Sequence, residues 1–94
     1  MAAPKKYDVV VFGASGFTGK FVVEELLVQK AAHPFKFAIG GRSGKKLAAV
    51  DKGRNLPIII ADVNDRQSML LMCSQARVVL NCVGPVGLLR VFSH

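Results

Sequence analysis

The chain has 94 residues, a net charge of +7 and a hydrophobic content of 51%. This length limits the chain to one domain, and the apolar content favours a packed core over disorder. No stretch reaches the ~18 consecutive apolar residues of a membrane span. Residues 1–8 are too short and too polar for the apolar region of a signal peptide. Cys73 and Cys82 lack the spacing of a zinc site, so we expect reduced thiols in an intracellular, cytoplasmic protein.

Residues 7–12 predict a buried strand that runs into a glycine-rich turn. Four apolar residues follow one another without a polar break, as in a parallel strand covered on both faces. Gly13, Gly16 and Gly19 come next at even spacing, and an apolar helical segment begins at Phe17. In this context the first glycine permits a sharp turn, the second lets a pyrophosphate approach the backbone, and the third lets the helix pack closely.

The turn differs in one respect from the usual dinucleotide fingerprint. Its first two glycines stand three residues apart rather than two, so the turn is one residue longer. Ser15 and Thr18 add hydroxyl groups that can donate to phosphate, beside the free N–H groups at the start of the helix. The alternative is a glycine-rich turn without a ligand.

The first helix is predicted over 17–29, with Phe21, Val22, Leu26 and Val28 on its apolar face. A second strand is expected over 35–40. Apolar residues alternate there with Lys36 and Ala38, which indicates a strand less buried than the first.

Ser43 is a plausible N-cap for a short helix over 44–50, and Gly53 is the expected left-handed residue after it. A third apolar strand covers 58–61. Asn64 or Asp65 is expected to cap the helix that follows and runs to about residue 75, and Gln67 resembles the glutamine of a capping box.

Residues 78–83 predict a fourth strand, which Gly84 and Pro85 end, and residues 86–94 give no clear pattern. The element order β-α-β-α-β-α-β is typical of an α/β fold with a doubly wound parallel sheet. Right-handed crossovers give four strands in the order 3-2-1-4, a partial Rossmann fold. The fourth strand would then be an exposed apolar edge.

Ligands of such sheets bind beyond the carboxyl ends of the strands. Gly41 lies near the position where an acidic residue holds the ribose of NAD, but Arg42 and Ser43 follow it instead. A guanidinium can grip a 2′-phosphate, so the sequence favours NADP over NAD as the cofactor. For Arg42 the alternative is an ordinary surface base.

Three further residues are candidates at this edge. Asp62 can bond the adenine amino group or act as a plain loop or capping acid. Gly84 lets the backbone approach the middle of the cofactor, and Asn81 either passes the cofactor or satisfies neighbouring backbone. The predicted cofactor-binding residues are Gly13, Ser15, Gly16, Phe17, Thr18, Gly19, Gly41, Arg42, Ser43, Asp62, Asn81 and Gly84.

The basic residues between 42 and 54 (Arg42, Lys45, Lys46, Lys52 and Arg54) are expected where the anionic nucleotide lies. The other bases, such as Lys5 and Lys6, are interpreted as solvated. No nucleic-acid motif is recognisable, so nucleic acid is not the expected partner.

No catalytic residue and no metal site is predicted. His33 precedes the second strand at the wrong edge of the sheet, His94 is the last residue, and Cys82 lies within a strand. The sequence therefore predicts a cofactor-binding segment without the groups that position a substrate.

Three motifs together resemble the amino-terminal segment of saccharopine dehydrogenase-like oxidoreductases. They are Val-Val-Phe-Gly-Ala-Ser-Gly-Phe-Thr-Gly-Lys-Phe-Val (10–22), Ala-Ile-Gly-Gly-Arg-Ser (38–43) and Val-Val-Leu-Asn-Cys-Val-Gly-Pro (78–85). The resemblance implies a Rossmann domain, a nicotinamide cofactor and a separate substrate domain. It also implies kinship with trans-acting enoyl reductases and association with membranes or lipid droplets.

The family pattern is lost after Pro85, and the segment between the second and third strands is short. We therefore expect residues 1–94 to form one dinucleotide-binding domain of a truncated chain. We expect the carboxyl-terminal part of the Rossmann domain and the substrate domain to be missing, and the resemblance implies hydride transfer for the full-length protein only. The alternatives are a non-catalytic NADP-sensing module, like the NmrA-type regulators, or a product without activity that docks on the full-length protein through its open sheet edge.

Overall fold

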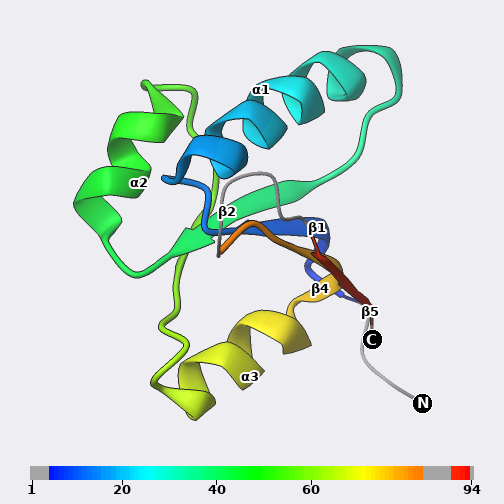
Figure 1. Ribbon diagram of the computed structural model, residues 1–94. Coiled ribbons are helices and arrows are strands. Elements are labelled where there is room, and N and C mark those ends of the chain that lie inside the picture. The colour runs from blue at the N-terminus through cyan, green and yellow to red at the C-terminus, as the bar shows by residue number, and fades with distance from the viewer. Residues whose placement is uncertain (1–4, 84–89, 94) are drawn as a thin grey trace.

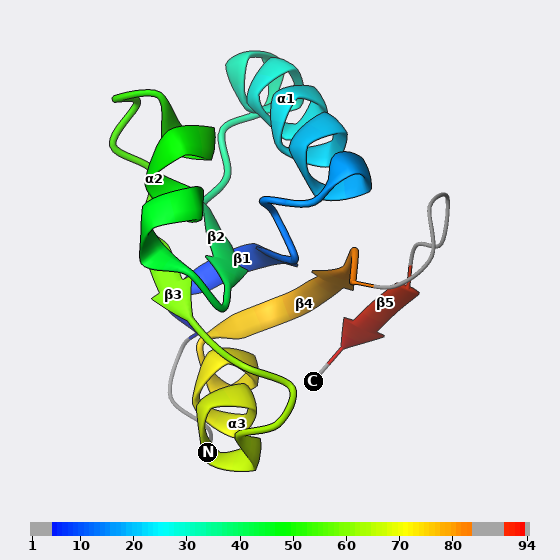
Figure 2. The ribbon, with the colours of Figure 1, turned by 60° about the vertical axis from the view of Figure 1, so that its left-hand side comes forward.

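The computed structural model describes residues 5–83 and 90–93. The helices are α1 (Phe17–Ala32), α2 (Gly44–Asp51) and α3 (Arg66–Ser74), and the strands are β1 (Tyr7–Phe12), β2 (Phe37–Gly41), β3 (Ile58–Ile60), β4 (Ala76–Asn81) and β5 (Arg90–Ser93). The strands form one sheet in the order β3-β2-β1-β4-β5. Figures 1 and 2 show α1 and α2 on one side of this sheet and α3 on the other.

Strand β1 is the centre of the parallel part of the sheet. It pairs with β2 on one side and with β4 on the other, and β2 pairs with β3, all in parallel. The predicted order 3-2-1-4 is confirmed. The carboxyl ends of the four parallel strands consequently meet at one edge of the sheet, beside the starts of the helices that follow β1, β2 and β3.

Strand β5 was not predicted. It runs antiparallel to β4, with Asn81 opposite Arg90 and Val78 opposite Ser93 (Figure 2). The expectation of an open edge at β4 is therefore wrong, and so is the docking surface that depended on it. Four residues are too few to show the two-residue period of a strand. The pairing of β5 with β4 also depends on residues outside the segment itself, so the local sequence does not predict it.

The core lies in two clusters, one on each face of the sheet. Val11, Val23, Phe37, Ile39 and Leu47 belong to the cluster beneath α1 and α2. The cluster beneath α3 contains Val10, Phe12, Ala38, Met72 and Val79. Alternate residues of β1 and β2 thus enter opposite clusters, as expected for strands covered on both faces.

Two burial predictions were wrong. Strand β2 is buried at every position rather than partly exposed, because it lies between β1 and β3 with helices over both faces. On α1 the exposed fraction of Phe21 is 72%, and Val28 is exposed as well. Gly19 and Val23 point into the core instead, so Phe21 lies on the outer face of the helix.

The helix caps agree with the sequence in part. The Ser43 hydroxyl accepts a hydrogen bond from the Lys46 N–H, as predicted for the start of α2. Asp65 caps α3 by accepting from the Ser68 N–H, which excludes Asn64 and its capping box with Gln67. At the end of α2, Lys52 adopts the left-handed conformation, and Gly53 follows it with the predicted positive φ, +73°.

Two glycines join β1 to α1. Gly13 has a φ of +84°, and its N–H donates to the Gly40 carbonyl at 2.9 Å. A Cβ on Gly19 would collide with the Gly13 carbonyl and would lie 2.7 Å from the Cα of Ala14. The first helical turn of α1 therefore packs directly against the backbone of Gly13 and Ala14. Only glycine at position 19 permits so close an approach of the two backbone segments.

We predict that Gly19→Ala lowers the free energy of unfolding by about 2–3 kcal/mol, because the colliding atoms belong to backbone that cannot move away. Gly44→Ala is the matched control. Its Cβ would lie 3.4 Å from the flexible end of Ile60, and alanine favours the helix. Urea denaturation measures both. A Gly19→Ala variant as stable as the parent chain would contradict this packing.

Candidate functional site

A pocket of about 340 Å³ lies at the carboxyl edge of the parallel strands. Its wall begins with the turn after β1 and the first residues of α1. The ends of β2, β3 and β4 complete it, through Arg42, Asp62 and Val83. Four strand ends and one helix start thus meet at one cavity, which is the ligand position of doubly wound sheets.

The turn presents backbone to this pocket. A Cβ on Gly16 would meet only the Gly13 carbonyl, at 3.4 Å, so the space above Gly16 is open to a ligand. A Cβ on Gly13 would come within 2.8 Å of the Val83 side chain. The first turn of α1 contains no acidic residue. Its positive end therefore favours an anion.

The end of β2 supplies a cation. Gly41 and Arg42 line the pocket, and the Arg42 side chain is exposed. Within the described residues, Arg42 belongs to neither ion pair. A Cβ on Gly41 would lie 3.3 Å from Leu47, so α2 packs tightly behind this position. Ser43 does not line the pocket, and its hydroxyl caps α2 instead.

The ends of β3 and β4 complete the wall. One Asp62 carboxylate oxygen accepts from the Asn64 N–H at 2.9 Å, while the side chain lines the pocket. The Asn81 amide oxygen accepts from the Val83 N–H at 3.0 Å and lies outside the pocket lining. Asn81 therefore satisfies neighbouring backbone, which was the alternative role for it. Gly84 lies outside the described residues.

The structure brings eight of the predicted site residues together around the pocket: Gly13, Ser15, Gly16, Phe17, Thr18, Gly41, Arg42 and Asp62. Gly19 serves the packing of α1 on the turn. Sequence reasoning missed five residues of the lining: Phe12, Ala61, Val63, Cys82 and Val83. Their signal was positional, because each lies at the carboxyl end of a strand or within three residues after it.

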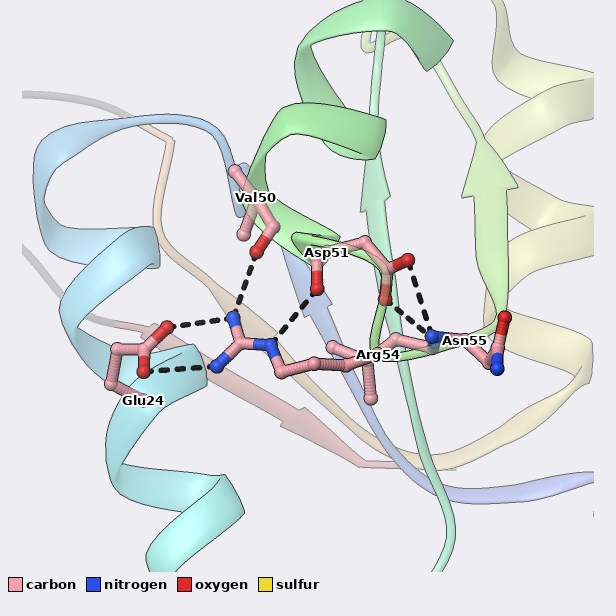
Figure 3. Close-up of polar contacts among 6 residues, drawn as sticks. Glu24, Val50, Asp51, Arg54 and Asn55 are labelled. Carbon is pink, nitrogen blue, oxygen red and sulfur yellow. Dashed lines mark hydrogen bonds and ion pairs between the residues drawn. The ribbon is translucent and has the colours of Figure 1, made fainter.

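Of the predicted basic cluster only Arg42 lines this pocket, and the other four members do not: Lys45, Lys46, Lys52 and Arg54. Arg54 donates to both carboxylate oxygens of Glu24, at 3.1 and 2.8 Å, and to the carbonyls of Val50 and Asp51 (Figure 3). It therefore joins the middle of α1 to the end of α2. The expectation that Arg54 faces the nucleotide is wrong, because its donors are used in this clamp.

Two kinds of pKa shift occur among the described residues. The hydrogen bond and charge of Arg54 lower the pKa of Glu24 below its usual 4.5. Glu24 in turn raises the pKa of Arg54. Burial raises the pKa of the Cys82 thiol, so Cys82 is protonated at neutral pH and is a poor nucleophile.

These features fit a dinucleotide that carries an additional phosphate on its ribose. Open backbone at Gly16 and the positive end of α1 suit the pyrophosphate, and an exposed guanidinium at the end of β2 suits an extra phosphate on the ribose. The fold and the pocket define a dinucleotide-binding domain of the doubly wound α/β class.

The saccharopine dehydrogenase NADP-binding domain family matches residues 9–94, and the chain belongs to that family. Its cofactor is NADP, as the sequence favoured. A lipid droplet localized protein of Caenorhabditis elegans is 45% identical over 92 residues, which cover 88% of this chain and 22% of the relative. The saccharopine dehydrogenase-like oxidoreductase of Homo sapiens is 42% identical over 96 residues, with 86% and 22% covered.

A relative from Arabidopsis thaliana, named "Probable mitochondrial saccharopine dehydrogenase-like oxidoreductase", is 38% identical over 91 residues, covering 84% of this chain and 20% of the relative. The chain thus spans about a fifth of the length of the curated relatives it matches. No solved structure matches it significantly. Within the described residues, no helix is both long enough and apolar enough to cross a membrane.

We predict that the Glu24–Arg54 pair makes stability pH-dependent. Because the folded pKa of Glu24 is lowered, its contribution is present above pH 4.5 and is lost as the pH falls through the lowered value. Glu24→Gln should decrease Tm at pH 7 by on the order of a few degrees or less. The difference in Tm between Glu24→Gln and the parent chain should disappear at acidic pH.

Glu25→Gln is the control, since Glu25 lies next in α1 and belongs to neither ion pair of the described residues. Thermal denaturation from pH 7 to pH 3 measures the differences. Equal effects of the two substitutions at pH 7 would show that the pair adds nothing.

Proposed function

We propose that the carboxyl-edge pocket binds NADP(H), with its pyrophosphate on the turn from Gly13 to Thr18 and its 2′-phosphate on Arg42. The observation that carries the proposal is the joining of open glycine backbone and an exposed arginine at one pocket. The backbone N–H groups at the start of α1 would meet the pyrophosphate. Ser15 and Thr18 stand beside them in the lining.

Arg42 would decide between the two nicotinamide cofactors. NAD is usually held by an acidic residue at the end of the second strand, which would repel a 2′-phosphate. Here the corresponding strand end carries a guanidinium in the pocket lining. Charge-assisted hydrogen bonds from arginine to phosphate are about twice as strong as neutral ones.

The adenine would lie against the end of β3. Asp62 and Val63 line the pocket there, next to Ala61. One oxygen of Asp62 is engaged by the Asn64 N–H, which fixes the carboxylate in place. We assign its second oxygen to the adenine amino group, and Val63 to an apolar contact with the ring.

We assign hydride transfer to a longer protein of this family, because the matched relatives are several times longer than the segment that they share with this chain. In that protein this domain would hold the cofactor, and further residues would hold the substrate. The name of the Caenorhabditis elegans relative supports a location at lipid droplets, while that of the Arabidopsis thaliana relative points to mitochondria.

Calorimetric titration with NADPH and NADH tests the proposal. The parent chain should bind NADPH more tightly than NADH. Arg42→Ala should weaken the affinity for NADPH by about 10–100-fold, which is the contribution expected of charge-assisted hydrogen bonds. It should change the affinity for NADH by less than about threefold.

Arg77→Ala is the matched control, because Arg77 is an exposed arginine at the opposite end of β4. It should leave both affinities unchanged. If Arg42→Ala and Arg77→Ala have equal effects, Arg42 does not bind the 2′-phosphate. If neither cofactor binds to the folded chain, the proposal itself fails.

A further inference from the structure

A second pocket, of about 440 Å³, lies at the amino edge of the sheet. Residues that precede β1 and β2 line it, together with Asp8 in the first part of β1 and the last turn of α1. Four of the seven lining residues are lysines, namely Lys5, Lys6, Lys30 and Lys36. This edge is opposite to the cofactor pocket, because β1 and β2 run in parallel from one to the other.

The lining offsets only part of the charge of these lysines. Asp8 is the one acidic residue of the lining, against four ammonium groups, so the pocket has a net charge of +3. The Asp8 carboxylate is itself engaged by the Lys36 N–H at 3.0 Å and lies 3.8 Å from the Arg77 guanidinium. Almost half of the chain's net charge of +7 therefore stands at this pocket.

Three of the ammonium groups are held in place by other contacts. The Lys5 ammonium donates to the Ser74 carbonyl at 3.3 Å. Those of Lys6 and Lys30 each lie 5.7 Å from the centre of an aromatic ring, Tyr7 and Phe37 respectively. A cation–π contact of this length orients the side chain and leaves the other face of the ammonium to a ligand.

We propose that this amino-edge pocket is a second anion site, which binds phosphate groups independently of the cofactor. A phosphate carries up to two charges and several acceptor oxygens, and it can meet several ammonium groups together. Lysines act as point charges without the fixed fork of arginine, so they suit a phosphate whose orientation varies. The phosphate belongs either to a soluble metabolite or to the headgroup of an anionic lipid.

The test compares two triple variants with equal loss of charge. Lys6, Lys30 and Lys36 are changed to Gln in the first, and Lys45, Lys46 and Lys52 of the α2 region in the second. Lys5 is kept because of its bond to Ser74. Circular dichroism establishes that both fold. Inorganic pyrophosphate is titrated by calorimetry into chain saturated with NADPH, and flotation with phosphatidylcholine vesicles containing phosphatidic acid examines the lipid source.

Each lysine near an anionic surface contributes about fivefold in affinity. The amino-edge variant should therefore bind the phosphate probe at least tenfold more weakly, with unchanged affinity for NADPH. The α2 variant should retain binding of the probe within about threefold. Binding of pyrophosphate identifies a soluble ligand, and binding of vesicles alone identifies a lipid headgroup.

Equal losses in the two variants would show an effect of total charge and overturn the proposal. Binding of neither probe by the parent chain would overturn it as well. The inference does not rest on the cofactor site. If NADPH fails to bind, the same comparison of variants without it still decides whether the amino-edge pocket takes phosphate.

Discussion

The contact between Gly19 and the turn at Gly13 is the constraint on which the rest of the structure depends. A Cβ at Gly19 would occupy the place of the Gly13 carbonyl, so the first turn of α1 sits directly on the end of β1. This position directs the positive end of α1 into the carboxyl-edge pocket. It also fixes which face of α1 enters the core, since Val23 lies one turn further along. The contact between Gly19 and Gly13 therefore determines both the position of the pocket and the face of α1 that packs in the core.

The charge of the chain is organised around the same sheet. Arg42 stands at the carboxyl edge beside the glycine turn, and the lysine pocket stands at the amino edge. Arg54 belongs to neither, because Glu24 and two carbonyls of α2 use its donors (Figure 3). The basic residues of the described chain thus gather at both edges of the sheet, and the two proposed anion sites would lie at opposite ends of the same strands.

Local patterns predicted the features that depend on local residues. The strand, glycine turn and helix at the start and the Ser43 cap follow from neighbours in sequence, and the order of the parallel strands follows from the right-handed crossovers between them. The features that were wrong depend on distant partners. Phe21 has the right spacing for a core residue, but the packing of Gly19 turns it outward. Arg54 contacts Glu24, which lies thirty residues away, and β5 is defined by its antiparallel pairing with β4. The site was predicted from strand ends, and its apolar wall was missed because apolar residues there resemble core.

The most direct test of the account is the map of backbone amide NMR shifts on addition of NADPH. The account predicts large changes at residues 13–20 and 41–43 and around Asp62, with little change at the amino edge near Lys30 and Lys36. Such a pattern would place the cofactor across the carboxyl ends of the strands. Changes concentrated at the amino edge, or none in the glycine turn, would contradict the central claim that this turn holds the pyrophosphate.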